Sequence, residues 1–297
     1  MPKSKRFTTW VGILIQGYAI WAGISHSLIW PSMWPKTGVL FYVWLLYILG
    51  GCIMNGMLTS EFVRKTQLES EQIAAQQIQK TLQPETLEEL AGYEMELFFK
   101  PFRAVSGDYF DVMELPGNRT LFALADVSGK GMPAALLAAN IQALVRSLAN
   151  IEADPLVLTR QINGHLIRYT PSNRFATAVF IVLNRDSGEL IYVNAGHNAP
   201  IVLCAGSTTF LEPTGLPIGL LSDAEYQAGA GIVGPGGTLL LFTDGLIDSI
   251  SGDEPESRLR DAISDDPARS MSNIKSLIDP RFNEDDVTIL VVKRIDR

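Results

Sequence analysis

Two apolar runs near the start of the chain constrain its fold more than any other feature of the sequence. Residues 10–30 (WVGILIQGYAIWAGISHSLIW) and residues 39–58 (VLFYVWLLYILGGCIMNGML) contain no Asp, Glu, Lys or Arg. Each run has about 20 residues, and a helix of that length, rising about 1.5 Å per residue, crosses a hydrocarbon core of about 30 Å. The segment between them, PSMWPKTG, has the Pro and Gly residues of a tight turn. The sequence therefore predicts a two-helix transmembrane hairpin over residues 1–59.

The basic residues around the two runs predict how this hairpin is oriented. Three precede the first run, two follow the second and one lies in the turn, namely Lys3, Lys5, Arg6, Arg64, Lys65 and Lys36. The positive-inside rule places both ends in the cytoplasm. We therefore expect a multi-pass protein of the cytoplasmic (inner) membrane whose C-terminal part lies in the cytoplasm. A cleaved signal peptide is the alternative for the first run, but that run is long for one and a second apolar run follows at once.

The rest of the chain has the composition of a folded, acidic domain. The whole chain has 297 residues, of which 47% are hydrophobic, and a formal net charge of −8. The hydrophobic content is sufficient for a packed core. The acidic balance argues against nucleic acid as the main partner, because phosphate backbones are bound by clustered Lys and Arg. Two cysteines, Cys52 and Cys204, do not make a disulfide framework.

Residues 60–84 join the apolar runs to the rest of the chain and are rich in residues that favour helices. They contain no Gly, and their Pro stands at the last position, so a continuous connecting helix is predicted. Apolar residues at spacings of seven, three and four form a short heptad-like seam: Leu68, Ala75, Ile78 and Leu82. The seam fits pairing with a second copy in a homodimer or packing on the chain's own domain, and two heptads do not separate these alternatives.

Residues 85–297 change to a pattern of short strands, turns and helices. Five apolar or β-branched runs have the length of strands: residues 120–125, 175–183, 190–194, 238–242 and 287–292. Two longer stretches, residues 133–149 and 155–169, have the pattern of helices. A turn at residues 186–188 joins two of the strands as in a hairpin. The pattern predicts an α+β domain with antiparallel sheets.

Aspartates from four separate segments lie at the ends of predicted strands. They are Asp108 and Asp111 in SGDYFDV, Asp126 after LFALA, Asp244 after TLLLFT, and Asp285 with Asp286 before VTILVV. One such aspartate is an ordinary turn former, but four segments together favour a shared site of hard oxygen ligands. Such ligands suit Mg²⁺ or Mn²⁺, whereas the three histidines and two cysteines lack zinc-ligand spacing. Two ions held by carboxylates activate a water and neutralise the oxygens of a phosphoryl group.

Several motifs, taken together and in this order, resemble those of a known enzyme family. They are SGDYFDV, ADVSGKGMPAALLAA, FATAVFIVL with ELIYVNAGHNAPIVL, GLPIGLL, LLLFTDGLIDS and EDDVTILVV. Over residues 85–297 the chain is similar to the SpoIIE/RsbU-type branch of the bacterial metal-dependent (type 2C, PPM) protein serine/threonine phosphatases. The resemblance implies an αββα sandwich of two antiparallel sheets flanked by helices, with the metal ions at one end. Ser106 and Ala104 depart from the residues that many relatives carry, and neither change removes a ligand.

The resemblance also implies a set of metal ligands. These are the side chains of Asp108, Asp126, Asp244 and Asp285 and the backbone carbonyl of Val127. Asp126 would bridge two Mn²⁺ or Mg²⁺ ions, and catalysis would depend above all on Asp126 and Asp244. The nucleophile would be a metal-bridged water rather than a side chain.

Four further residues are expected around these ligands. Arg103 would hold the substrate phosphate, since a guanidinium binds phosphate bidentately; a solvated arginine is the alternative. Asp111 and Asp286 would support the ligands from behind. His197, in NAGHN, would order a loop, and a general-acid role is its alternative.

Together these inferences predict a membrane-anchored cytoplasmic protein serine/threonine phosphatase that hydrolyses phosphoserine or phosphothreonine. By the resemblance, its substrate is a phosphorylated anti-sigma-factor antagonist of the STAS type, in a partner-switching pathway. One alternative is a catalytically silent phosphatase-like scaffold that binds a signalling partner. Another is a diguanylate cyclase, whose GGDEF loop is partly matched by SGDYF. Tyr109 stands at an acidic position of that loop and the later motifs do not fit, which disfavours a cyclase.

Overall fold

The computed structural model describes most of the chain from residue 34 onward. The described residues are 21, 34–82, 87, 89–151, 153–171, 173–204, 206–251, 254–279, 281 and 284–295. Apart from Trp21, the first apolar run and the turn after it lie outside these residues, and so does that half of the predicted hairpin. The chain divides into two compact units, Met1–Glu71 and Gln72–Arg297, which we describe one at a time.

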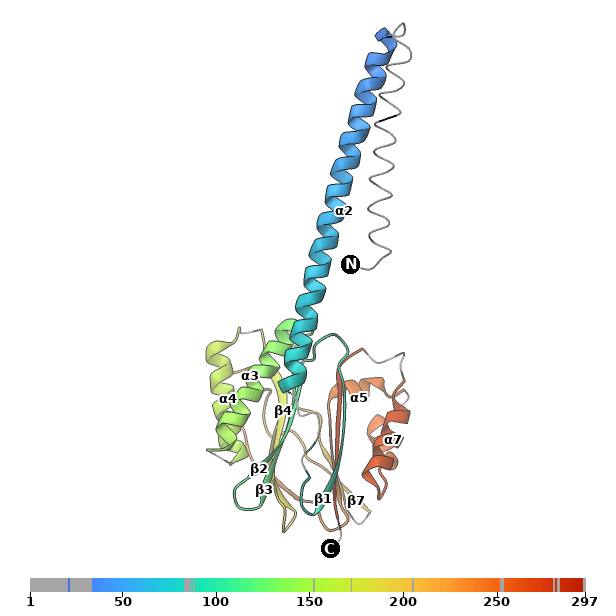
Figure 1. Cartoon of the computed structure of the whole chain (residues 1–297). Helices are drawn as coiled ribbons and strands as arrows, with labels where there is room; N and C mark the ends of the chain where they lie inside the picture. Colours follow the sequence, from blue (N-terminus) through green and yellow to red (C-terminus); the bar gives the residue numbers. More distant parts are fainter. Residues whose placement is uncertain are drawn as a thin grey trace. The chain divides into compact units, whose positions relative to one another are not determined.

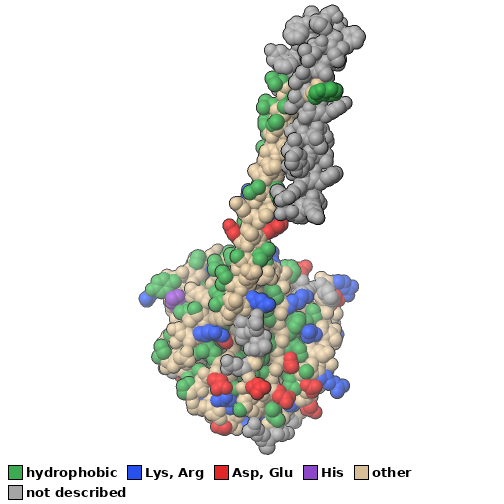
Figure 2. All heavy atoms as spheres, in the orientation of Figure 1, with side chains coloured by type: hydrophobic (Ala, Val, Ile, Leu, Met, Phe, Trp, Pro, Cys, Tyr) green, Lys and Arg blue, Asp and Glu red, His purple; other side chains and the backbone are tan. Residues whose placement is uncertain are grey.

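One long helix, α2 (Trp34–Leu82, 49 residues), contains the second apolar run and most of the connecting segment. The sequence explains its length, because no Pro interrupts it between Pro35 in its first turn and Pro84. Figure 2 shows hydrophobic side chains on the surface of this helix. Its exposed large apolar side chains include Leu45, Tyr47, Leu49, Ile53, Met54, Met57 and Leu58. An exposed apolar surface of this kind is typical of a segment that contacts lipid or another protein.

Among the described residues, one helix has the length and hydropathy of a membrane span, and it is α3 (Met132–Ala149). Its apolar side chains Leu137, Ile141 and Val145 are buried in the core of the second unit. Burial of this kind is typical of a core helix rather than a membrane span. The described part of the chain therefore gives no support to the expected multi-pass hairpin.

The second unit contains two five-stranded sheets, and the named strands pair antiparallel throughout. One sheet has the order β1 (Tyr93–Lys100), β10 (Val287–Arg294), β9 (Thr238–Phe242), β6 (Ile201–Cys204) and β7 (Ser207–Phe210). The other has the order β2 (Asp108–Leu115), β3 (Arg119–Val127), β4 (Ala176–Asn184), β5 (Glu189–Ala195) and β8 (Gly229–Ile232). The prediction of an α+β domain with antiparallel sheets is confirmed.

Helices cover the outer faces of both sheets (Figure 1). α3 and α4 (Pro155–Tyr169) pack on the sheet that contains β3. α5 (Asp244–Ser249), α6 (Pro255–Ala262) and α7 (Pro267–Leu277) pack on the sheet that contains β10. The order of layers is helices, sheet, sheet, helices, as the family resemblance implied.

The sequence of β3, RTLFALADV, shows how both faces of a sheet are filled. Side chains alternate along a strand, and those of Leu121 and Ala123 pack towards α3 and α4 while those of Phe122 and Leu124 pack between the sheets. Because both faces are buried, the strand has an almost continuous apolar sequence. The alternation puts Asp126 on the inner face, at the end of the sandwich.

Candidate functional site

The four aspartate segments meet at one end of the sandwich. Asp108 begins β2 and lies directly opposite Asp126 on β3. Asp244 follows β9 and Asp285 precedes β10, and because these neighbouring strands are antiparallel, both residues lie at the same end of their sheet. The hydroxyl of Thr243 donates a hydrogen bond to Asp108 over 2.9 Å, which joins this end of one sheet to the other. Aspartates that are distant in the sequence therefore share one region.

Burial and mutual repulsion act together on these carboxylates. Burial raises the pKa of Asp126 to about 7, and the charges of Asp244 and Asp285 add to the effect. Burial, followed by the charge of Asp285, also raises the pKa of Asp244. The pKa of Asp108 is raised by its burial and then by the charge of Asp126. A bound cation relieves repulsion of this kind.

The donor set fits hard divalent cations that keep part of their water shell. Among the described residues, no three Asp, Glu, His or Cys side chains stand close enough to form a closed cage around one ion. Mg²⁺ does not need such a cage, because it retains several waters and takes only one or two carboxylates. The four aspartates therefore suit hydrated Mg²⁺ or Mn²⁺, and a closed zinc site does not fit.

Two threonines that the sequence reasoning missed hold Asp108 in place. Thr243 and Thr288 both donate their hydroxyl hydrogen bonds to Oδ2 of Asp108. The backbone N–H of Thr288 donates to the hydroxyl oxygen of Thr243 over 3.0 Å, and all three residues are buried. Hydrogen bonds to a carboxylate favour its ionised form and fix its orientation. Both threonines were visible in the sequence, in the TDG and DDVT motifs beside the aspartates.

Asp286 holds the loop that leads to Asp108. Its Oδ1 atom accepts a hydrogen bond from the backbone N–H of Phe102, and its Oδ2 atom accepts one from Gly107, each over 2.7 Å. One side chain thus closes residues 102–107 into a fixed loop. This is the arrangement expected of a residue that supports a metal ligand.

Val127 ends β3, and its side chain is buried. Its backbone N–H donates a hydrogen bond to the carbonyl of Gly107 over 3.3 Å. A Cβ atom on Gly107 would lie 3.3 Å from the carbonyl oxygen of Val127, so glycine keeps space around that oxygen. The carbonyl expected to bind a metal ion therefore lies beside the loop that leads to Asp108.

Asp111 does not join the cluster, contrary to expectation. It lies three residues after Asp108 on β2, so its side chain points to the opposite face of the sheet, towards α3. There Arg146 donates hydrogen bonds to its carboxylate over 2.6 and 3.2 Å, and the hydroxyl of Tyr109 donates one over 3.3 Å. Asp111 therefore anchors α3 to the sheet. The odd spacing of the two aspartates on a strand was the signal that separates their roles.

His197 is buried beside β4, the strand next to β3, which carries Asp126. Its Nδ1 atom lies 2.8 Å from the hydroxyl of Thr177, which pairs with Asp126 across β3 and β4. Its backbone N–H donates a hydrogen bond to Asn194 over 2.7 Å. Burial lowers the pKa of the imidazole to about 4, so the ring is neutral near neutral pH. This position suits a residue that orders its neighbours, and it gives no support to the general-acid alternative.

Two arginines lie beside the loop between β3 and α3, residues 128–131. Arg103 is exposed, and its Nη1 atom lies 3.8 Å from the position that a Cβ atom would take on Gly131. Nη1 of Arg174 donates a hydrogen bond to the carbonyl of Ser128 over 2.9 Å. Sequence reasoning missed Arg174, because nothing in its local sequence marks it and only the fold brings it to this loop. Arg174 therefore supports this loop, and the phosphate-binding role of Arg103 stays a prediction.

The last turns of α2 contact this end of the same unit. Nε2 of Gln79 donates a hydrogen bond to the carbonyl of Ser106 over 2.7 Å, and Oε1 accepts one from its N–H over 2.9 Å. Gln142 of α3 donates a hydrogen bond to the carbonyl of Leu82. The end of the connecting helix therefore packs on its own domain. Its contact there, Ser106, is two residues before Asp108 in the sequence.

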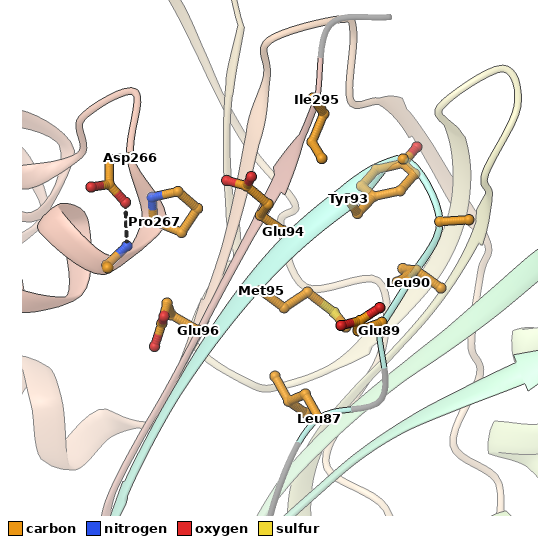
Figure 3. Close-up of a pocket in the computed structure, with 13 residues that line it drawn as sticks. Leu87, Glu89, Leu90, Tyr93, Glu94, Met95, Glu96, Asp266, Pro267 and Ile295 are labelled. Carbon is orange, nitrogen blue, oxygen red and sulfur yellow. Dashed lines mark hydrogen bonds between the residues drawn. The ribbon is translucent and has the colours of Figure 1, made fainter.

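A surface cavity of about 650 Å³ lies at the opposite end of the sandwich, beside the start of β1 and the start of α7 (Figure 3). Four of its lining residues are acidic: Glu89, Glu94, Glu96 and Asp266. Asp266 caps α7, accepting a hydrogen bond from the N–H of Ala268 over 2.9 Å. Among the described lining residues there is no Lys or Arg. None of the expected metal ligands lines this cavity, so it is not the candidate site.

A comparison with protein families matches residues 116–295, more than half of the chain, to the family described as Stage II sporulation protein E (SpoIIE). The phosphoserine phosphatase RsbU of Bacillus subtilis (strain 168) is 27% identical over 182 residues, which are 61% of this chain and 54% of RsbU. The chain thus spans about half the length of this relative.

Solved structures show the same fold. The PP2C domain of SiaA from Pseudomonas aeruginosa has a TM-score of 0.65 at 21% identity, covering 78% of this chain and 99% of that domain. RsbX, solved in complex with magnesium, has a TM-score of 0.58 at 19% identity, covering 70% of this chain and 98% of RsbX.

Proposed function

Because the chain belongs to the SpoIIE family, we propose that residues 85–297 form a metal-dependent protein serine/threonine phosphatase. The observation that carries the proposal is the meeting of four acidic segments at one end of the sandwich. There, burial and the neighbouring carboxylates raise the pKa of Asp126 to about 7. Such a site attracts divalent cations, which hydrolysis of a phosphate monoester needs to neutralise its charged transition state. The name of RsbU, a phosphoserine phosphatase, supports the assignment.

We expect two Mg²⁺ or Mn²⁺ ions to be held by Asp108, Asp126, Asp244, Asp285 and the carbonyl of Val127. After burial, the charges of both Asp244 and Asp285 raise the pKa of Asp126, which supports a bridging position for Asp126. When bound, the ions would supply an activated water and neutralise the phosphoryl oxygens. The magnesium complex of RsbX, which shares the fold, supports this choice of cofactor.

The other residues of the site would orient the ligands and the substrate. Thr243 and Thr288 donate hydrogen bonds to Oδ2 of Asp108 and so fix the orientation of this carboxylate towards a metal ion. Arg103 would bind the phosphate of the substrate through its guanidinium. His197, buried and neutral, would keep the strand ends in register.

We propose that the substrate is a phosphorylated STAS-type anti-sigma-factor antagonist and that the enzyme acts in a partner-switching pathway. The support is the similarity to RsbU. Anchoring in the cytoplasmic membrane is supported by the two uncharged runs and by the exposed apolar side chains of α2. Pairing of two copies is supported by the seam residues Leu68, Ile78 and Leu82, which are exposed in the single chain.

The test uses the full chain purified in detergent. We expect Mn²⁺-dependent release of phosphate from a chromogenic phosphate ester and from a phosphoserine peptide. Asp126→Asn should abolish it, because the carboxylate expected to bridge the two metal ions is lost. Asp223→Asn, at an exposed loop position, is the matched control and should leave the rate unchanged. Metal-dependent binding of a phosphoprotein with no release of phosphate by the unaltered chain would instead favour the silent scaffold.

A further inference from the structure

Lys130 lies in the loop between β3 and α3 and reaches the segment before β10. Its ammonium lies 2.7 Å from Oδ2 of Asp285 and donates a hydrogen bond to the carbonyl of Glu284 over 2.6 Å. The same ammonium lies 5.3 Å from the ring centre of Phe102. Three contacts therefore hold one positive charge on one of the expected metal ligands.

Lys130 contacts Oδ2, one of the two carboxylate oxygens of Asp285. The other oxygen of Asp285, Oδ1, accepts a hydrogen bond from the backbone N–H of Asp286 over 2.9 Å. A divalent ion and an ammonium group compete for the same lone pairs of a carboxylate oxygen. The charge of Lys130 also opposes the repulsion among the neighbouring carboxylates, as a bound cation would.

We propose that Lys130 is a built-in counter-ion of the metal centre, which neutralises Asp285 in the metal-free protein and leaves it when a divalent ion binds. Lys130 thereby sets the metal affinity of the site. The inference rests on the proposed function in one respect, that Asp285 is a metal ligand.

A purely structural salt bridge is the competing explanation for this pair. The side chains of Lys130 and Asp285 are 39% and 35% exposed, so the pair is partly screened by water. A structural bridge would stabilise the protein equally with and without metal. A counter-ion that the metal displaces stabilises only the metal-free protein, and its removal strengthens metal binding.

The experiment titrates Mn²⁺ into the full chain by calorimetry, for the unaltered protein, Lys130→Met and Lys130→Arg. We expect Lys130→Met to bind Mn²⁺ about two- to fivefold more tightly, the size of a partly exposed ion pair. Lys130→Arg keeps the charge and should bind as the unaltered protein does. Lys130→Gln serves as a second uncharged variant if Lys130→Met does not fold.

The matched control is Lys293→Met. Lys293 shares two kinds of contact with Lys130: it donates a hydrogen bond to a backbone carbonyl, that of Gly236 over 2.6 Å, and it forms an ion pair, with Asp265 at 3.4 Å. Lys293 lies near the other end of β10, eight residues from Asp285, which is about 26 Å of extended chain at 3.3 Å per residue. We expect its loss to leave the Mn²⁺ affinity unchanged.

Thermal unfolding gives a second measurement. Lys130→Met should unfold at a lower temperature than the unaltered protein in a chelator, and at the same temperature in saturating Mn²⁺. Equal destabilisation in both conditions, or an unchanged or weaker Mn²⁺ affinity, would overturn the proposal. So would an unaltered chain that binds no Mn²⁺. If phosphate release is absent but the affinity shift is present, the proposed function fails while this inference stands.

Discussion

The two ends of the sandwich are both acidic, yet they differ in what surrounds the carboxylates. At the candidate site Asp108 is buried and Asp126 half-buried, and after burial the charges of neighbouring carboxylates raise the pKa of both. At the opposite end Glu94 and Asp266 are exposed beside an open cavity. Water screens charges at an exposed surface, whereas buried like charges need a cation. The difference teaches that burial, rather than acidic composition, distinguishes a metal site.

The largest effect is expected from removing a carboxylate at the candidate site. Asp244→Asn should lower Mn²⁺-dependent phosphate release by at least about a hundredfold, since even supporting residues of metal sites are worth ten- to hundredfold. Glu94→Gln, which makes the same change at the cavity end, should leave the rate unchanged. Steady-state kinetics of both variants make the comparison, and equal losses would mean that the two ends do not differ as described.

The threonine support of Asp108 should have the next largest effect. Thr288→Val keeps the shape of the side chain and removes its hydrogen bond to Asp108, so we expect about ten- to hundredfold weaker Mn²⁺ binding. Thr120→Val is the control, because Thr120 is also buried and its hydroxyl has no partner among the described residues. Calorimetric titration measures both. A loss of affinity in the control would point to a general effect on folding.

Metal should stabilise the protein, and more so at higher pH. The pKa of Asp126 is about 7 in the metal-free fold against an ordinary value of 3.8, so the metal-free protein loses stability as pH rises between these values. Mn²⁺ binds the ionised carboxylate, so the gain in unfolding temperature should grow from pH 6 to pH 8. At a hundredfold excess over the dissociation constant, bound metal adds about 2.7 kcal/mol.

Differential scanning fluorimetry with Mn²⁺ or a chelator measures this gain. Asp126→Asn cannot ionise and should show a gain that is smaller and less dependent on pH. If the rise in unfolding temperature caused by Mn²⁺ became smaller as pH increased, the electrostatic account of the candidate site would be wrong.

The smallest effect is expected at the cavity end. Asp266→Ala removes the N-cap of α7 and should lower the free energy of unfolding by about 1 kcal/mol. Mn²⁺ affinity should not change, because the carboxylate lies at the other end of the sandwich. Asp154→Ala removes the equivalent cap of α4 and should have a similar effect on chemical denaturation. A change of metal affinity in Asp266→Ala alone would show that the two ends are coupled.

The sequence predicted the candidate ligands better than their surroundings. The positions of Asp126 and Asp244 at strand ends follow from local apolar runs, and the fold brings both to one region. The roles of Asp111 and Arg174 did not follow. Asp111 shares a motif with Asp108 but faces the other side of the sheet, and Arg174 reaches Ser128 across 46 residues of chain. Such contacts depend on strand register and on the packing of distant segments.

The sequence by itself determined the class of fold, the strand ends that carry carboxylates and the family to which the chain belongs. These follow from short-range patterns, because alternation and apolar runs are properties of neighbouring residues. Only the tertiary structure decided that Thr243 and Thr288 hold Asp108, and that Lys130 lies on Asp285. Each of these contacts joins segments whose distance is set by how two sheets pack, and no local pattern encodes that distance.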